Sequence, residues 1–320
     1  MLLNIVRRPA GVLAAAMAIG APVALAFAPA SASADDDRTV VVATTSVWAS
    51  IVDQLDCTDA FDVQTLVPVG GDPHEYEPSM RDRATLDEAA LVVSNGAGLE
   101  SLLTDTLDAV ADDGTPVYAV ADHVTLSPMG AADSTPSDDD SGDSGGDDPH
   151  IWFDPTLVAE ALASLADALV AAGADRPAID ACADALAQNL TDLDGQVAGI
   201  LDAVPEARRL LVTNHDALGY FARHYGWRIL GSVLPSSSTL AEASPAQLER
   251  LADDIEAAGV PAIFTEQLET TDEATALADR LGVRVVTLYT DSLGDADSGV
   301  TTYQDLLRVD AQSIAEALAP

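Results

Sequence analysis

Lysine is absent from this 320-residue sequence, and its 14 basic side chains, all arginine, face 53 aspartates and glutamates. The formal net charge is therefore -39 at pH 7. Because binding to a nucleic-acid backbone depends on basic side chains that neutralise phosphates, this composition excludes nucleic acid as a partner. With 48% apolar residues the chain can still build a folded core, and its length suits two ordinary domains.

Long apolar runs are missing after residue 34, where nothing approaches the roughly 20 residues of a membrane helix. The first 34 residues differ, because Arg7 and Arg8 precede an apolar stretch at 11–28 and a small-residue end at 31–34. This order is typical of a cleaved export signal, although an uncleaved membrane anchor is the alternative. We expect a soluble protein in the periplasm or outside the cell, and without a cysteine at the cleavage site we expect no lipid anchor.

Cysteine is scarce, and Cys57 and Cys182 are the only two. Export would place both in an oxidising compartment, which favours one disulfide over two buried thiols. Such a bridge would close a long stretch of chain and could contribute on the order of 4 to 5 kcal/mol to stability.

Short β-branched runs alternate with helical patterns after the signal, which indicates βα units and parallel sheets, an α/β fold. Four runs in each half predict strands, at residues 40–44, 63–67, 91–94, 117–120, 210–213, 228–233, 262–265 and 284–288. The middle of the chain is almost entirely helical, and its second helical pattern, from Pro177 to about residue 204, would span roughly 40 Å. A helix of that length could bridge two lobes.

These patterns divide the chain into a signal peptide at 1–34, an N-terminal lobe at 35–175, a linker helix at 176–204 and a C-terminal lobe at 205–320. One segment, 127–148, lacks periodic apolar residues and is rich in Asp, Ser and Gly, which predicts a disordered acidic surface loop. The loop could raise the local concentration of cations, or it could be only a solvated insertion.

Three of the five histidines stand in constrained contexts. His74 and His150 each end an Asp-Pro-His triplet, in which proline stiffens the chain that presents the imidazole. His215 directly follows a predicted strand, at the end where α/β proteins place their ligands. Asp291 has the same position after the last strand, so two candidates fall in each half and a shared site would lie between the lobes.

Three imidazoles and a carboxylate form a plausible tetrahedral zinc set. The fourth ligand is less certain than the histidines, because Asp291 could simply cap a turn, and Glu266, at the end of another strand, or a water could replace it. His123 and His224 are not expected to be metal ligands.

These motifs resemble the metal-binding solute receptors of zinc and manganese ABC importers, the ZnuA, AztC and TroA-like family. The resemblance covers essentially the whole chain after the signal and rests on the motifs GDPHEYEP (71–78), SNG (94–96), DPHIWFDP (148–155), TNHDA (213–217), FTE (264–266) and TDSLG (290–294). It implies two α/β lobes, each around a four-stranded parallel sheet and joined by a long helix, with metal held between them.

By motif match, His74, His150, His215 and Asp291 occupy the ligand positions of that family. Manganese-type relatives commonly carry glutamate where His215 stands, so histidine favours the zinc branch. The resemblance further implies a monomer that is not an enzyme and that delivers Zn²⁺ to an ABC permease, with a periplasmic metallochaperone as a further candidate partner. A Mn²⁺ receptor of the same family and a zinc-dependent hydrolase are the alternatives.

Overall fold

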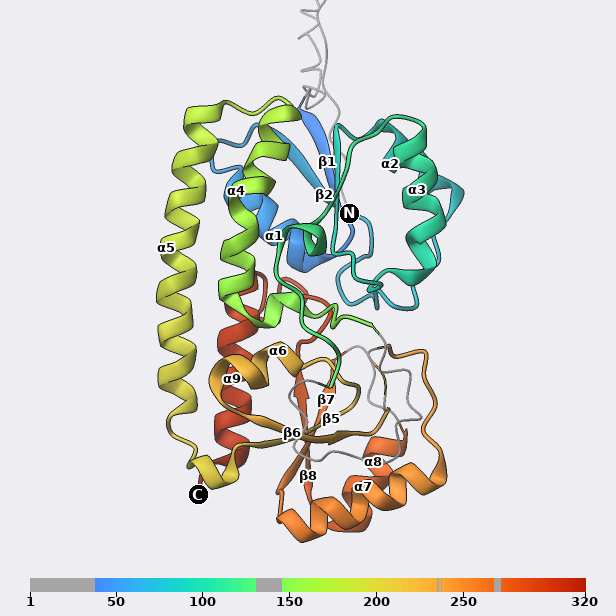
Figure 1. Cartoon of the computed structure of the whole chain (residues 1–320), viewed down its shortest axis with the longest axis vertical. Helices are drawn as coiled ribbons and strands as arrows, with labels where there is room; N and C mark the ends of the chain where they lie inside the picture. The colour runs from blue at the N-terminus through green and yellow to red at the C-terminus, as the bar shows by residue number, and fades with distance from the viewer. Residues whose placement is uncertain (1–37, 131–145, 235, 237, 268–271) are drawn as a thin grey trace, which may run out of the picture. The chain divides into compact units, whose positions relative to one another are not determined.

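Two parallel four-stranded sheets organise the chain, in a computed structural model that describes residues 38–130, 146–234, 236, 238–267 and 272–320 (Figure 1). The first sheet has the order β2-β1-β3-β4 and consists of β1 (Thr39–Ala43), β2 (Phe61–Thr65), β3 (Leu91–Ser94) and β4 (Val117–Ala119). The second has the matching order β6-β5-β7-β8 and consists of β5 (Leu210–Thr213), β6 (Arg228–Ser232), β7 (Ala262–Glu266) and β8 (Arg284–Leu288). The predicted α/β class with two four-stranded parallel sheets is confirmed.

The helices lie between the strands and after them. Before the middle of the chain come α1 (Ser46–Leu55), α2 (Met80–Glu88) and α3 (Thr104–Asp112), and the middle holds α4 (Pro155–Ala171) and α5 (Arg176–Leu201). The second sheet is accompanied by α6 (Gly219–Tyr225), α7 (Pro245–Ala258), α8 (Asp272–Leu281) and α9 (Tyr303–Leu318). None of these helices of the described residues is both long and apolar enough to cross a membrane.

β3, β5 and β8 begin and end where the sequence predicted, whereas β2 starts two residues before the expected range 63–67. The reason lies at the end of α1, where the two carboxylate oxygens of Asp56 accept from Ala60 N at 2.9 Å and Phe61 N at 2.7 Å. These bonds turn the chain directly into the strand, so Phe61 is its first residue.

Alternating side chains connect each sheet to two hydrophobic clusters. In β1, Val41 and Ala43 point into the largest cluster and Val42 into a smaller one with residues of α2 and α3. In β5, Leu211 points into the largest cluster, while Val212 packs with residues of α7 and α8. Because successive side chains of a strand point to opposite faces, each sheet has one face on the largest cluster, which both halves of the chain share.

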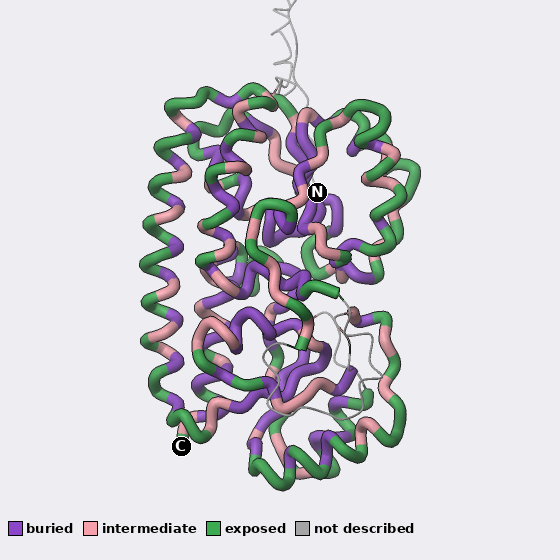
Figure 2. The backbone as a smooth tube through the Cα atoms, viewed as in Figure 1, coloured by how far each residue is buried: buried purple, intermediate pink, exposed green. Residues whose placement is uncertain are grey.

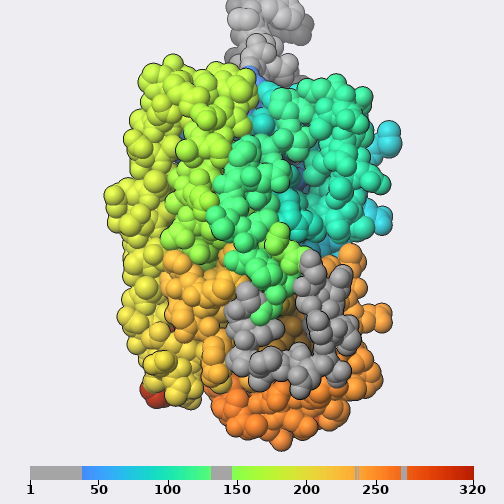
Figure 3. Space-filling model, viewed as in Figure 1, coloured from blue at the N-terminus to red at the C-terminus, as the bar shows by residue number. Residues whose placement is uncertain are grey.

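α5 packs against α4, α1 and α9 and so contacts helices of both halves (Figure 1). Its buried side chains recur every three or four residues along one face, while the other face is exposed (Figure 2). In the space-filling view, α4 and α5 form a continuous surface (Figure 3). The residues from Arg38 onward form one compact unit, and the domain boundaries predicted at 175 and 204 stay predictions.

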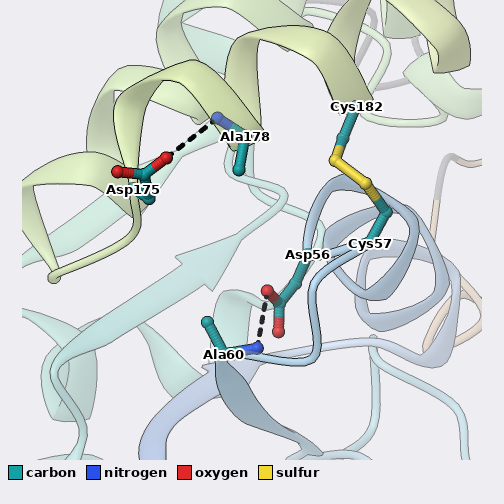
Figure 4. The surroundings of a disulfide bond; sticks show 6 residues. All are labelled: Asp56, Cys57, Ala60, Asp175, Ala178 and Cys182. Atoms are coloured by element: carbon teal, nitrogen blue, oxygen red, sulfur yellow. Dashed lines mark hydrogen bonds between the residues drawn. A yellow bond between two sulfur atoms is a disulfide. The ribbon is translucent and has the colours of Figure 1, made fainter.

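A disulfide joins Cys57, just after α1, to Cys182 in α5, with 6.0 Å between their Cα atoms (Figure 4). It agrees with the predicted bridge and ties the beginning of the long helix to the first sheet's own helix. The N-terminal cap of α5 lies nearby, where Asp175 Oδ2 accepts from Ala178 N at 3.2 Å.

Two predicted segments lie wholly or partly outside the described residues. The export signal at 1–34 is one, and residues 131–145 of the acidic loop are the other. The base of that loop is described: Pro128 and Asp147 form an antiparallel bridge, and Asp148 N donates to Ser127 O at 2.8 Å.

Candidate metal centre

His74 lies in the loop that follows β2, after a tight turn in which Gly71 N donates to the Pro68 carbonyl at 2.7 Å. Gly70 has a φ of +79°, which residues with a Cβ rarely adopt, and a Cβ on Gly71 would lie 2.9 Å from the Pro68 oxygen. The turn therefore requires both glycines. Beyond it, Asp72 Oδ1 accepts from His74 N at 2.8 Å, which fixes the backbone that presents the imidazole.

His150 repeats this arrangement in the second Asp-Pro-His triplet. Asp148 Oδ1 accepts from His150 N at 3.0 Å and from its ring Nδ1 at 2.9 Å, so the same carboxylate orients backbone and ring. Asn95 fixes the middle residue by donating from Nδ2 to Pro149 O at 2.8 Å, and its own Oδ1 accepts from Trp48 Nε1 at 2.9 Å. The Nε2 atom of His150 is therefore the ring nitrogen that remains for binding a metal ion.

His215 and Asp291 come from strand ends of the second sheet. His215 follows β5, and its Nδ1 donates to the carboxylate of Glu266, the last residue of β7. Asp291 lies beyond β8, where Trp152 Nε1 donates to the preceding Thr290 O at 2.9 Å and the Trp152 ring packs edge-on against His150. Because carboxyl ends of neighbouring parallel strands meet at one edge of a sheet, these side chains converge.

The structure brings the four predicted side chains together, with one ligand atom of each within 4.8 Å of all the others. His150 Nε2 and His215 Nε2 lie 3.1 Å apart. Asp291 Oδ1 lies 4.0 Å from His74 Nε2 and 3.7 Å from His150 Nε2, and its Oδ2 lies 3.8 Å from His215 Nε2. All four residues are at least 98% buried.

This cluster contains buried polar atoms that no protein group satisfies. Among the described residues, His74 Nε2 and both Asp291 carboxylate oxygens make no hydrogen bond. Such atoms are rare in folded proteins, because burying a polar atom without a partner costs free energy. Imidazole nitrogens and a carboxylate facing a common point are the donor set of a divalent transition metal, so the residues fit a metal ion of that class.

The electrostatics of His74 and His150 agree with this chemistry. Burial, with smaller contributions from the neighbouring imidazoles, lowers the pKa of His74 well below its ordinary value, and burial does the same for His150. Both rings are therefore neutral, which is the form that binds metal. Burial opposes a charge on His215, but the facing Glu266 and Asp291 carboxylates raise its pKa to about 10. Burial also raises the pKa of Asp291 to about 7.

The other candidates lie elsewhere. Glu266 stands behind His215 as its hydrogen-bond partner and is outside the group of four. His123 stacks on Tyr118 with ring centroids 4.4 Å apart. His224 contacts Asp154 through Nδ1 at 3.3 Å and Asp194 through Nε2 at 2.7 Å, so both ring nitrogens are occupied.

The sequence patterns did not reveal that Asp72 and Asp148 orient the two histidines. We attributed the stiffness of the two triplets to proline, yet in both of them the aspartate Oδ1 accepts from the histidine backbone N. The repetition of aspartate at the same position was the available signal, since an Asp side chain commonly bonds the backbone two residues on.

Comparison with known proteins decides the family. The family model described as "ZnuA: Zinc-uptake complex component A periplasmic" matches residues 41–317. The chain belongs to this family. The resemblance drawn from the motifs is confirmed, and with it the general role of a metal-binding solute receptor of ABC importers. The ZnuA family is a family of transport receptors and not of enzymes.

The relatives of this chain are named for different metals. The "Zinc-binding protein TroA" of Treponema pallidum is 30% identical over 295 residues, which cover 90% of this chain and 91% of TroA. The "Manganese-binding lipoprotein MntA" of Halalkalibacterium halodurans is 28% identical over 289 residues, with 90% and 91% covered. The relatives therefore do not decide which metal this chain binds. The name of MntA as a lipoprotein argues against the expected lack of a lipid anchor but does not decide it.

Solved structures of metal-binding proteins share the fold of this chain. TroA of Treponema pallidum superposes with a TM-score of 0.79 and 28% sequence identity, covering 88% of this chain and 100% of that one. A Cd-bound periplasmic metal-binding protein of Candidatus Liberibacter asiaticus, 24% identical, superposes with a TM-score of 0.73 over the same shares and attests the fold alone.

Proposed function

We propose that this protein captures Zn²⁺ with His74, His150, His215 and Asp291 and delivers it to the permease of an ABC importer. One observation carries the proposal: three imidazoles and a carboxylate, all buried, place one ligand atom each within 4.8 Å of the others. Two of the three imidazoles have their Nδ1 bound to a carboxylate, which directs Nε2 toward the common centre.

The choice of zinc rests on the donor set. Imidazole nitrogen suits zinc well, whereas manganese prefers sites rich in oxygen, so three nitrogens and one carboxylate favour Zn²⁺. A Mn²⁺ receptor is the second candidate, because relatives such as MntA are named for manganese. Copper and nickel would bind the same donors tightly, so a direct metal analysis is part of the test.

A zinc-dependent hydrolase has less support. A catalytic zinc site uses three protein ligands and keeps one position for water, whereas here Asp291 supplies a fourth ligand. Family membership also supports transport. A monomeric state, a metallochaperone partner and free diffusion after export stay predictions.

The proposal is tested by metal analysis of protein purified without added metal, followed by isothermal titration with Zn²⁺ and with Mn²⁺. We expect one Zn²⁺ per chain and weaker binding of Mn²⁺. His150→Ala should reduce zinc affinity sharply, whereas the matched control His224→Ala should change it little. Tighter binding of Mn²⁺ than of Zn²⁺ would make the second candidate the function.

A titration at two pH values tests the ligands themselves. Protons compete with metal for imidazole nitrogens, so zinc affinity should be lower at pH 5.5 than at pH 7.5. Equal affinity at both values would contradict ligation by histidine.

A further inference from the structure

The loop at 68–74 carries the first ligand, His74, but two of its hydrogen bonds run to the second half of the chain. Gly70 N donates to Ser292 Oγ at 2.8 Å, and Thr239 Oγ1 donates to Asp72 Oδ2 at 2.7 Å. The loop follows β2 of the first sheet, whereas Thr239 lies between β6 and α7 and Ser292 lies after β8. Loops that follow strands of the second sheet thus hold the loop that carries His74 in the first half of the chain.

Apolar packing contributes little at the tip of this loop. Val69 is 49% exposed, and it lines, together with Gly70, a pocket of about 370 Å³ whose other walls are Gln267, Tyr289, Asp295 and Ser298. The two hydrogen bonds to Thr239 and Ser292 therefore matter more for the position of the loop than they would in a packed core.

Thr239 and Ser292 are each linked to a proposed metal ligand, the first through Asp72 and the second through the chain itself. Asp72 uses one carboxylate oxygen to accept from Thr239 and the other to accept from His74 N, so it links Thr239 to the first ligand. Ser292 is the neighbour of Asp291, and it is 98% buried. Movement of the second sheet's loops would thus displace His74 and Asp291 together.

We propose that Thr239 and Ser292 are positioning residues that hold the His74 loop in its binding conformation and thereby set the rate of metal release. The inference rests on the proposed function, because it takes the four-residue cluster as the metal site. Metal cannot leave until His74 moves away, and this movement breaks the bond between Thr239 and the Asp72 carboxylate. A site built this way opens when its two halves separate, without any change in the ligands.

The test measures zinc release by stopped flow, with Zn²⁺-loaded protein mixed into an excess of a chromogenic chelator. Thr239→Val removes the hydroxyl and keeps the shape, and it should speed release about tenfold, since one hydrogen bond to a charged group is lost. Thr239→Ser keeps the hydroxyl and should release at nearly the wild-type rate. Thr191→Val is the control, because the Thr191 hydroxyl donates within its own helix, to Ala187 O, and has no other partner among the described residues.

Several outcomes separate the possibilities. Equal release by the wild type and Thr239→Val would overturn the inference and leave the proposed function intact, whereas a wild type that binds no zinc would overturn the proposed function. Faster release by Thr239→Ser to the same degree as by Thr239→Val would also overturn the inference, because packing would then be the cause. Should Thr239→Val fail to fold, Ser292→Ala carries the same expectation of faster release.

Discussion

Asp310 is a buried carboxyl group whose effect on stability can be tested by substitution. It lies on α9, is 99% buried, and accepts from Tyr289 N at 2.9 Å through Oδ1, while its Oδ2 has no partner among the described residues. Burial raises the pKa of Asp310 well above its ordinary value. A carboxyl whose pKa is higher in the folded state destabilises the fold progressively as the pH rises above its unfolded value.

Asp310→Asn removes the ionisable group and keeps the acceptor for Tyr289. Keeping a proton at pH 7 on a carboxyl with an unfolded pKa of about 3.9 costs about 4 kcal/mol, which sets the upper limit of the gain. We expect Asp310→Asn to raise the free energy of unfolding by about 2 to 4 kcal/mol at pH 7, and by no more than about 1.5 kcal/mol at pH 5.

Urea unfolding in the presence of a chelator, at pH 5 and pH 7, measures this difference. Asp254→Asn, at an exposed position of α7, is the control and should show no comparable dependence on pH. A variant at Asp310 that is less stable than the wild type at pH 7, or a gain that is the same at both pH values, would refute the assignment of a buried protonated carboxyl.

Three further predictions concern the carboxylate behind His215, the histidine outside the centre and the disulfide. Glu266→Gln should weaken zinc binding by about 10- to 100-fold in a calorimetric titration, since it loses a charged partner of a ligating imidazole, and unchanged affinity would contradict that role. The hydrogen bonds that His224 donates to the Asp154 and Asp194 carboxylates, opposed by partial burial, raise the pKa of His224 to about 9. The contribution of protonated His224 to stability is complete below pH 6.5 and disappears as the pH rises through 9. His224→Ala should therefore lower the free energy of unfolding, measured with urea, by about 1 to 2 kcal/mol at pH 6 and by less at pH 10. Replacing both cysteines by serine should lower the free energy of unfolding by about 4 kcal/mol while zinc affinity stays the same, and a parallel loss of affinity would show that the bridge shapes the centre.

The strands were predictable because they are short and rich in β-branched residues. Residues 91–94, 210–213 and 284–288 form strands with the bounds that the sequence predicted, since each run contains adjacent β-branched or other apolar residues and ends at residues of a different kind. β2 was displaced because its start depends on the side chain of Asp56, which bonds the backbone beyond α1. A pattern of apolar residues contains no information about such a bond.

The four candidate ligands could be chosen from the sequence because two signals coincide, the repeated triplet and the position after a parallel strand. What could not be chosen was the division of work between Asp291 and Glu266, as both are acids at strand ends of the second sheet. Their roles depend on which of them faces the imidazoles and which stands behind one. That distinction comes from the order β6-β5-β7-β8, which puts Glu266 on the strand beside the one that leads to His215.

The indole of Trp152 has a use that goes beyond its place in the fold. It packs against the His150 ring, with centroids 5.4 Å apart, and is hydrogen-bonded to the residue before Asp291, so any change at either group alters its surroundings. The chain therefore contains its own optical probe of occupancy. A version in which Trp227 is replaced by phenylalanine would let fluorescence follow loading and unloading in real time without a dye, because Trp48 would add only a background signal.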